Sequence, residues 1–340
     1  MTVEQGSPYG IPPSSFFDAQ VSDQFEVILD AINYPFVETI YGPTTQWLFA
    51  LAYLISPGEL WPLQLLIGLS DLLVVLLLLK LAKPTAVLLY AWSPLVIKEF
   101  VITTHPDVLG VMFILLALVL LSNKKYLTSV GICMALACGV KIFAIMVLPF
   151  ILRFEWKAWL AFIITAILIA LPFGLRDAWL PGGLSAMSSD WLFNAPIYFL
   201  AELIAGSWLS LSALKFTLIG ILGAASATYL LRFLMKGPDT IVHKELRGDL
   251  LYLGLFLCAP AFNAWYLIWL LPFAVIRPSV WAWVLSISIM FSYASGINLN
   301  NTGLEAYQHS GWMLSIEFMP PVIAIILISL SKRLSPNNEN

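Results

Sequence analysis

The residues best suited to chemistry lie together in one short segment, from Lys98 to Asp107. The segment starts with a lysine and Glu99, and it ends with His105 and Asp107 on either side of a proline. A carboxylate can remove a proton from a hydroxyl group, and a cation can stabilise a phosphate. The His105 and Asp107 side chains could hold a divalent metal ion, although one such pair alone assigns no metal ligand. An aspartate at a helix start can also simply cap free backbone N–H groups.

Cations inside or beside apolar segments form the second group of candidates: Lys98, Lys141, Arg176 and Lys215. Ionisable residues in such positions are costly and are functional candidates by default. Gathered at one face of a membrane, these side chains would suit an anionic headgroup such as a lipid phosphate. Lys98 could instead pair with Glu99, and Lys215 could extend to the interface. Lys141 has no acid beside it in the sequence, so a purely structural role explains it less well than it explains Lys98 or Lys215.

Two aromatic stretches could contact a sugar or a lipid chain. The first surrounds Asp190, and the second contains Asn263, Trp265 and Tyr266. Aromatic rings offer flat apolar faces, and the amide and carboxylate offer hydrogen bonds. An aromatic belt at the membrane surface explains the same residues nearly as well. We therefore predict these four residues as sugar or lipid contacts and keep the belt as the alternative.

The composition indicates the environment in which these residues must work. Of 340 residues, 60% are hydrophobic and 11% are charged, against about 25% charged in an ordinary soluble domain. Lipid must therefore be the main solvent. The net charge of -3, with dispersed cations, argues against nucleic-acid binding. The sequence contains no P-loop, dinucleotide turn, nucleophile elbow or paired-cysteine motif, so no cofactor is predicted.

The apolar pattern predicts an all-α polytopic membrane protein with roughly 8–11 membrane segments, some of them re-entrant or broken. Residues 44–56 are apolar but short and are followed by Pro57, which favours an interfacial or re-entrant helix. The predicted spans cover residues 60–79, 85–100, 108–121, 127–152, 159–173, 213–231, 250–275, 280–295 and 313–330.

The basic residues predict which ends of these segments meet. Cytoplasmic loops collect Lys and Arg, and these gather around residues 80–83, 124–125, 153–157, 232–247, 277 and 332–333. Segments 127–152 and 250–275 each run from one basic connection to another, so each must turn back inside the membrane. Gly139-Val140-Lys141 and Pro260-Ala261-Phe262-Asn263 supply the breaks. Such backbone must be buried or line a cavity, so we expect a cavity near the exoplasmic face. The alternative is a single long tilted helix for each segment.

The same topology divides the chain into three parts: an exoplasmic loop at residues 1–43, a multi-span membrane domain at 44–335 and a cytoplasmic tail at 336–340. The first part is too polar to enter hydrocarbon and lacks the features of a signal peptide. Because it is expected outside, either an internal helix drives insertion or a first helix is encoded upstream of Met1.

The order of the motifs resembles the GT-C superfamily of polyprenyl-phosphate-sugar-dependent glycosyltransferases, especially its bacterial mannosyltransferase-like branch. The motifs are Gly6-Ser7-Pro8-Tyr9, Tyr41-Gly42-Pro43-Thr44-Thr45-Gln46-Trp47, Tyr90-Ala91-Trp92-Ser93-Pro94, His105-Pro106-Asp107, Lys141 before Pro149, and Trp265-Tyr266 followed by Trp269, Pro272 and Phe273. The resemblance covers most of the chain. It implies a GT-C-like helical bundle that transfers a sugar, most often mannose, from a polyprenyl-phosphate carrier. The acceptor would be a lipid or glycan on the exoplasmic side, and transfer would proceed with inversion.

The resemblance also implies a carboxylate base in the first exoplasmic loop. In the family the acidic stretch precedes the Pro-Tyr motif, and here only five residues come before Gly6. Asp107 and Glu38 are therefore the candidate catalytic residues, and Tyr41 is a candidate sugar or lipid contact. The candidate residues for the donor phosphate are Lys98, His105, Lys141, Arg176 and Lys215.

Two other kinds of function remain open. A secondary transporter or lipid flippase also uses broken helices and buried charge, but the sequence shows no convincing repeat. A catalytically inactive membrane subunit is the third hypothesis, and it gains weight from the missing acidic stretch.

Overall fold

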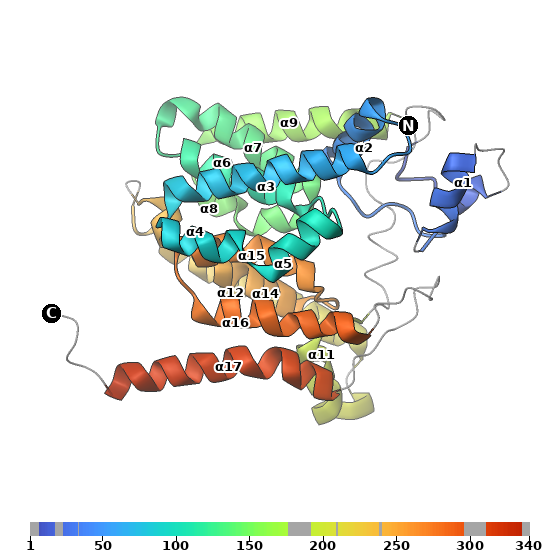
Figure 1. The fold of residues 1–340 in the computed structure, drawn as a ribbon. Helices are drawn as coiled ribbons and strands as arrows, with labels where there is room; N and C mark the ends of the chain where they lie inside the picture. The colour runs from blue at the N-terminus through green and yellow to red at the C-terminus, as the bar shows by residue number, and fades with distance from the viewer. Residues whose placement is uncertain are drawn as a thin grey trace.

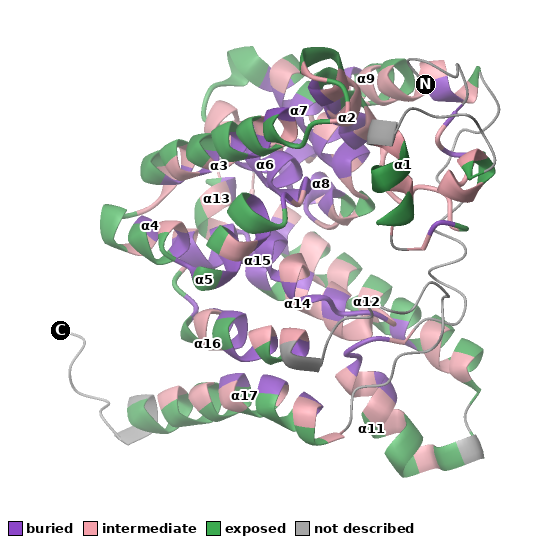
Figure 2. Cartoon of the chain, turned by 45° about the vertical axis from the view of Figure 1, so that its right-hand side comes forward, coloured by how far each residue is buried: buried purple, intermediate pink, exposed green. Residues whose placement is uncertain are grey.

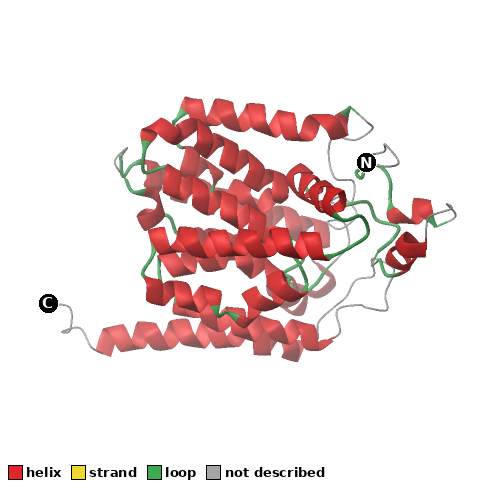
Figure 3. Ribbon diagram, turned by 45° about the horizontal axis from the view of Figure 1, so that its top comes forward, coloured by secondary structure: helices red, strands yellow, loops and turns green. Residues whose placement is uncertain are grey.

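The computed structural model describes residues 7–17, 23–32, 34–175, 192–208, 210–237, 240–295 and 311–334. These residues form helices and connections and no strand (Figure 3), apart from one isolated bridge between Phe193 and Ala261. The α-helices as far as Gly174 are α1 (Asp23–Asp30), α2 (Pro43–Ile55), α3 (Trp61–Leu81), α4 (Pro84–Ala91), α5 (Pro94–Ile97), α6 (Asp107–Leu120), α7 (Leu127–Val140), α8 (Leu148–Leu152) and α9 (Trp156–Gly174). The later ones are α11 (Pro196–Ala205), α12 (Leu211–Leu234), α13 (Val242–Glu245), α14 (Gly248–Cys258), α15 (Leu267–Ile276), α16 (Val280–Ser288) and α17 (Gly311–Leu334).

Four of these helices, α3, α9, α12 and α17, are long and apolar enough to cross a membrane. A fifth crossing is bent: α4 is followed by a segment from Pro94 to Ile102 at an angle of 50°. Pro94 lacks a backbone N–H and disfavours a helical residue before it, which explains the break. The remaining predicted spans are shorter helices or pairs of helices. The prediction of an all-α polytopic membrane fold is confirmed.

The centre of the bundle is α6, which is buried on nearly all sides and packs against α3, α7 and α15. Figure 2 shows the buried residues concentrated in α6, α7, α8 and α15, whereas α3, α12 and α17 carry exposed residues along their outer faces. On α3 these include Leu65, Leu69, Leu72 and Leu76, each about half exposed. A helix that is apolar all round and lies outside a bundle is typical of contact with lipid.

Two hairpins turn back inside the bundle, as the basic residues predicted. The chain leaves α7, passes a first break (residues 141–147) and returns through α8; it likewise leaves α14, passes a second break (residues 259–266) and returns through α15. Leu127 at the start of α7 and Ile151 near the end of α8 line one cavity, so both lie at the same end of the molecule. The Ser279 hydroxyl beyond α15 donates to Asp249 Oδ2 in α14 at 2.6 Å, which closes the second hairpin in the same way.

The basic connections gather where these hairpins begin and end, and we call this the basic end. Arg153 donates to the backbone oxygens of Gly237 and Thr240, and Arg277 donates to the backbone oxygen of Lys244. Figure 1 shows α1 and α2 at the opposite end of the bundle from the start of α4. The two breaks lie toward the end that carries α2, because α2 contacts the tip of α7.

One helix of ten residues lies where no element was predicted. α11 (Pro196–Ala205) has 10 residues and lies between the predicted outer loop and the span at 213–231. Its Leu203 and Ile204 side chains are 71% and 84% exposed, so it makes little core. This run is too short for a span and too apolar for a loop, so the sequence predicted no element there.

Candidate active site

The first break carries Lys141 into contact with the start of α6. Lys141 has an extended backbone, with φ at -156° and ψ at 141°, directly after the last residue of α7. Its Nζ lies 3.0 Å from Oδ1 of Asp107, and the two side chains are 13% and 1% exposed. Trp269 Nε1 donates to the same Asp107 oxygen at 2.6 Å. These three residues, from both hairpins and from α6, form what we call the Lys141 cluster.

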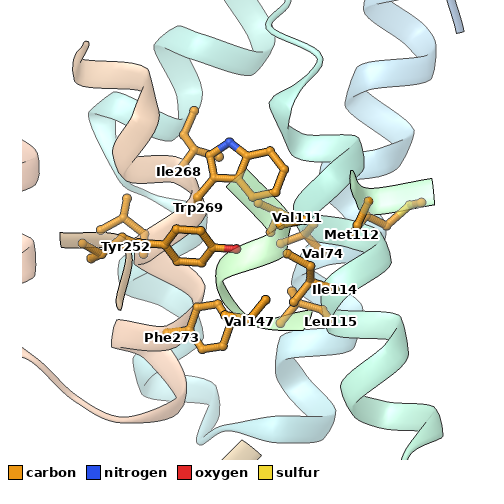
Figure 4. Packing of buried hydrophobic residues seen from close by; sticks show 14 of the residues in the cluster. Val74, Val111, Met112, Ile114, Leu115, Val147, Tyr252, Ile268, Trp269 and Phe273 are labelled. Carbon is orange, nitrogen blue, oxygen red and sulfur yellow. The ribbon is translucent and has the colours of Figure 1, made fainter. Parts of the chain in front are cut away.

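Aromatic rings enclose the lysine on its remaining sides. Its Nζ is 4.6 Å from the ring centroid of Tyr266 and 4.9 Å from that of Phe143. An ammonium group over a ring face is attracted to the ring's negative quadrupole, and the attraction is larger where water is excluded. Figure 4 shows Trp269 beside Tyr252, with its indole nitrogen on the side away from that ring. The surroundings therefore keep Lys141 charged through one carboxylate and two rings rather than through water.

The segment before α2 docks onto the tip of α7. Gly42 N–H donates to Val140 O at 3.3 Å, and the Thr45 hydroxyl donates to the same oxygen at 3.2 Å. The approach needs a glycine, because a Cβ at Gly42 would lie 2.2 Å from the Gly139 oxygen. Tyr41 precedes this contact and is placed where the charges of Lys141 and Asp107 act on it.

Burial is the main influence on Tyr41 and raises its pKa, while the Lys141 charge acts in the opposite direction. The phenol is therefore a hydrogen-bond donor at neutral pH. Glu38 lies three residues earlier and is half-buried. No hydrogen bond among the described residues joins Glu38 to Lys141 or Asp107, so its part in the site stays a prediction.

A second group of polar side chains surrounds Glu99, which is fully buried. Its Oε1 lies 2.8 Å from Lys98 Nζ and accepts from the Tyr293 hydroxyl. Its Oε2 accepts from the Thr103 hydroxyl at 2.8 Å and lies 3.2 Å from His105 Nε2. We call this the Glu99 cluster. Both oxygens of Glu99 are thus occupied, which makes it an anchor for its neighbours rather than a proton acceptor.

His105 links the two clusters. Its ring stacks on Trp265, with centroids 4.7 Å apart and planes at 21°, and its backbone N–H donates to Glu99 O at 2.9 Å. Burial lowers the pKa of His105, although the charges of Asp107 and Glu99 act in the opposite direction. A buried imidazole is harder to protonate than one in water. His105 is therefore neutral at physiological pH.

The structure brings together most of the predicted site residues that it describes. Those in or beside the two clusters are Tyr41, Lys98, His105, Asp107, Lys141, Trp265 and Tyr266. Asn263 is buried in the second break, where its backbone oxygen accepts from Tyr266 N–H at 3.0 Å. Lys215 lies on α12, whose main contacts are with α14 and α8, so its assignment to the site stays a prediction. Arg176 and Asp190 lie outside the described residues.

Three residues of the site were not predicted as such. Glu99 was weighed only as a neighbour of Lys98, and Trp269 only as part of a motif. Tyr293 carried no signal, because it is separated from Glu99 by 194 positions in the sequence. Within the described ranges no group of three or more His, Cys, Asp or Glu side chains is placed to hold a metal ion. The His105 and Asp107 side chains instead face Glu99 and Lys141.

A bundle of apolar helices with a buried polar site at two hairpin tips defines an integral membrane protein with a site near one end of the bundle. Residues 8–156 match the family model described as alpha-(1->6)-mannopyranosyltransferase, N-terminal domain. Over these residues the chain is similar to that family of mannosyltransferases, and the resemblance noted in the sequence is confirmed. The match supports a mannosyl-transferring glycosyltransferase. Neither a curated protein nor a solved structure matches the chain.

The matched range divides the site. It contains Lys98, His105, Asp107 and Lys141, together with the docked segment that carries Glu38 and Tyr41. The second hairpin, with Trp265, Tyr266 and Trp269, lies beyond residue 156 and completes the site from outside the matched range.

Proposed function

We propose that this protein transfers a mannosyl group from a polyprenyl-phosphate carrier to a lipid or glycan acceptor, with inversion, at the exoplasmic face. The observation that carries the proposal is the buried Lys141–Asp107 pair at the tip of a hairpin, beside His105 and Lys98. Ionisable residues buried among apolar helices are functional candidates by default. The basic end lies at the other end of the bundle, which supports an exoplasmic position for the site under the positive-inside rule.

In this reaction the carrier phosphate is the leaving group. The bond between the sugar C1 and the phosphate oxygen breaks, and its electron pair stays on the phosphate. Lys141 and Lys98 would stabilise that charge. The single N–H of the neutral His105 donates to Glu99, so His105 would position Glu99 and Lys98 rather than bind the phosphate itself. Because a phosphate leaves without being protonated, no general acid is required. Trp265 and Tyr266 would cover the sugar or the first isoprene unit.

The acceptor hydroxyl must lose its proton as the new bond to C1 forms. Asp107 is our first candidate for the base, because its Oδ2 has no hydrogen-bond partner in the described structure, whereas Oδ1 is bound to Lys141 and Trp269. The pairing of Oδ1 would orient Oδ2 toward the acceptor. Glu38 is the second candidate, because its segment is fixed to the tip of α7 by Gly42 and Thr45.

The test is transfer of labelled mannose from synthetic polyprenyl-phosphate mannose to a membrane lipid extract. We expect Lys141→Gln to raise KM for the donor and to lower kcat. Asp107→Asn and Glu38→Gln are compared for kcat at saturating donor, and the true base is the one whose loss lowers kcat at least about 100-fold. Lys80→Gln is the matched control, because Lys80 is an exposed lysine at the basic end.

Two outcomes would overturn the proposal. The first is no transfer by folded wild-type protein from the mannose donor or from its glucose, galactose or arabinose counterparts. The second is full transfer by Lys141→Gln, because the proposal makes that lysine a ligand of the departing phosphate.

A further inference from the structure

A separate cavity of about 540 Å³ lies at the basic end. It is formed where the end of α6, both ends of the first hairpin and the connection before α13 meet. Its apolar wall consists of Leu118, Leu121, Leu127, Ile151, Ile241 and Val242. α6 connects this cavity to the active site, because Asp107 begins that helix and Leu118 lies near its end.

The polar wall of the cavity is positively charged. Among the residues that the structure describes, it contains Lys124, Arg153 and Lys244, against one carboxylate, Glu155. His243 also lines it, and burial, followed by the charge of Lys244, lowers the pKa of that imidazole. His243 is therefore neutral at physiological pH and adds no charge. A site with three cations and one carboxylate attracts an anion.

Hydrogen bonds to backbone oxygens hold two of the cation-bearing segments in place. Arg153 Nη1 donates to Thr240 O at 3.4 Å and also donates to Gly237 O, which ties the end of α8 to the connection before α13. Arg277 Nη1 donates to the backbone oxygen of Lys244 at 3.0 Å. Because these contacts fix the walls, an anion would enter a preformed site and little ordering would accompany binding.

Exposed aromatic residues indicate the level of the cavity relative to the membrane. Phe154 and Trp156 flank Glu155 and are 81% and 66% exposed, and Tyr126, two residues after Lys124, is 46% exposed. Exposed rings next to apolar helix ends are typical of the membrane–water interface. A cavity at that level, with one apolar and one cationic wall, has the chemistry of a phospholipid headgroup and its first acyl carbons.

We propose that this cavity binds the phosphate of an anionic phospholipid. The glycerol and the start of the acyl chains lie against the apolar wall, and the phosphate lies between Lys124 and Lys244. A soluble phosphate would use only the cationic wall and would leave the apolar wall empty. The proposal is independent of the transferase activity, because the cavity lies at the other end of the bundle from Lys141.

The experiment measures lipid binding to the full chain in nanodiscs of phosphatidylcholine. Phosphatidylglycerol is titrated in, and retained lipid is counted by native mass spectrometry. The test variant is Lys124→Gln/Lys244→Gln, whose residues are both exposed. The control is Lys80→Gln/Lys83→Gln, which removes two cations from the same end without touching the cavity. Each lysine near an anionic lipid contributes enough to predict a loss of about 30-fold in affinity for the test variant.

A third variant works in the opposite direction. Glu155→Gln removes a carboxylate from the described lining of the cavity, so we expect tighter binding of phosphatidylglycerol. Glycerol 3-phosphate and inorganic phosphate form the competing arm, and neither should displace the lipid at equal concentration.

The proposal fails if both double variants lose affinity equally, because the effect would then be general surface charge. It also fails if the test variant binds as the wild type does, or if glycerol 3-phosphate competes as well as the lipid. Unfolding temperatures in pure phosphatidylcholine show that each variant is folded, so a loss of binding cannot be mistaken for a loss of structure.

Discussion

The first break and the second break both turn a hairpin back toward the basic end, but only the first carries a cation at its tip. Lys141 is paired with Asp107 and enclosed by rings. The second break, by contrast, is held by backbone. Phe193 N–H donates to Pro260 O at 3.0 Å, Phe262 N–H donates to Phe193 O at 2.9 Å, and the Asn194 amide donates to Phe262 O at 3.3 Å.

A buried carboxylate also lies beside the second break, and it is not paired. Glu317 of α17 is fully buried, and its two carboxylate oxygens accept no hydrogen bond among the described residues. Asn194 is its polar neighbour, and Phe318 next to it packs on Phe262 with centroids 5.6 Å apart. The comparison teaches that a broken helix can be completed in two ways. A charge pair suits chemistry with an anion, while a backbone bridge supplies a rigid wall of rings.

The strongest way to break this comparison is to remove the charge from the first break. Lys141→Met should lower the free energy of unfolding by about 3–5 kcal/mol, because it leaves Asp107 buried without its counter-ion. Thermal unfolding in nanodiscs measures the loss. Lys141→Met/Asp107→Asn should regain most of the stability and none of the transfer activity. Equal losses in the single and double variants would mean that the pair is not the origin of the effect.

The opposite sign is expected for the carboxylate beside the second break. Glu317→Gln should raise the free energy of unfolding by about 1–3 kcal/mol, because a neutral amide is cheaper to bury than a carboxylate without donors. The comparison with Asp107→Asn, which should destabilise, makes the test sharp: the same chemical change has opposite effects at the two sites. A loss of stability in Glu317→Gln would show that the Glu317 carboxylate is paired in the folded protein, as Asp107 is. The difference between the two sites would then disappear.

Much of this arrangement could be predicted from the sequence. Basic residues on both sides of segments 127–152 and 250–275 favoured a turn inside each over one long tilted helix, and Gly139-Val140-Lys141 and Pro260-Ala261-Phe262-Asn263 supplied the places. Lys141 was predicted at the site because it is a cation inside an apolar segment with no acid beside it. Asp107 was predicted there because it follows His105 at a helix start and could replace the acidic stretch of the resembling family.

The partners of those residues could not be predicted, for a physical reason. Trp269 and Tyr293 meet Asp107 and Glu99 through the packing of distant helices, and neither periodicity nor spacing encodes which helix lies beside which. Glu99 was underestimated because an adjacent lysine explains it locally. α11 was missed because its apolar run is shorter than a span and less polar than a loop.

A smaller effect is expected from the backbone of the second break. Asn194 has a φ of +50°, in the left-handed region that costs most residues about 1 kcal/mol. Asn194→Ala loses both the amide hydrogen bond to Phe262 O and the tolerance of asparagine for this conformation, so it should destabilise by about 1–2 kcal/mol. Asn194→Gly loses only the hydrogen bond and should be the more stable of the two. The reverse order, measured by thermal unfolding, would contradict the account of the bridge.

The smallest effect is expected at His105. It should make stability depend on pH near the first break but not at the second. Burial lowers the pKa of its imidazole below the usual 6.5, against the charges of Asp107 and Glu99 and together with those of Lys141 and Lys98. The unfolded chain therefore binds more protons at this position than the native one, so stability is lost as the pH falls below about 6.5. We expect His105→Gln to flatten the fall in unfolding temperature between pH 7.5 and pH 5. The same fall should persist in Asn194→Ala, because residues 259–266 contain no histidine. If His105→Gln and the wild type lose equal stability on acidification, the imidazole is not held neutral between the two clusters.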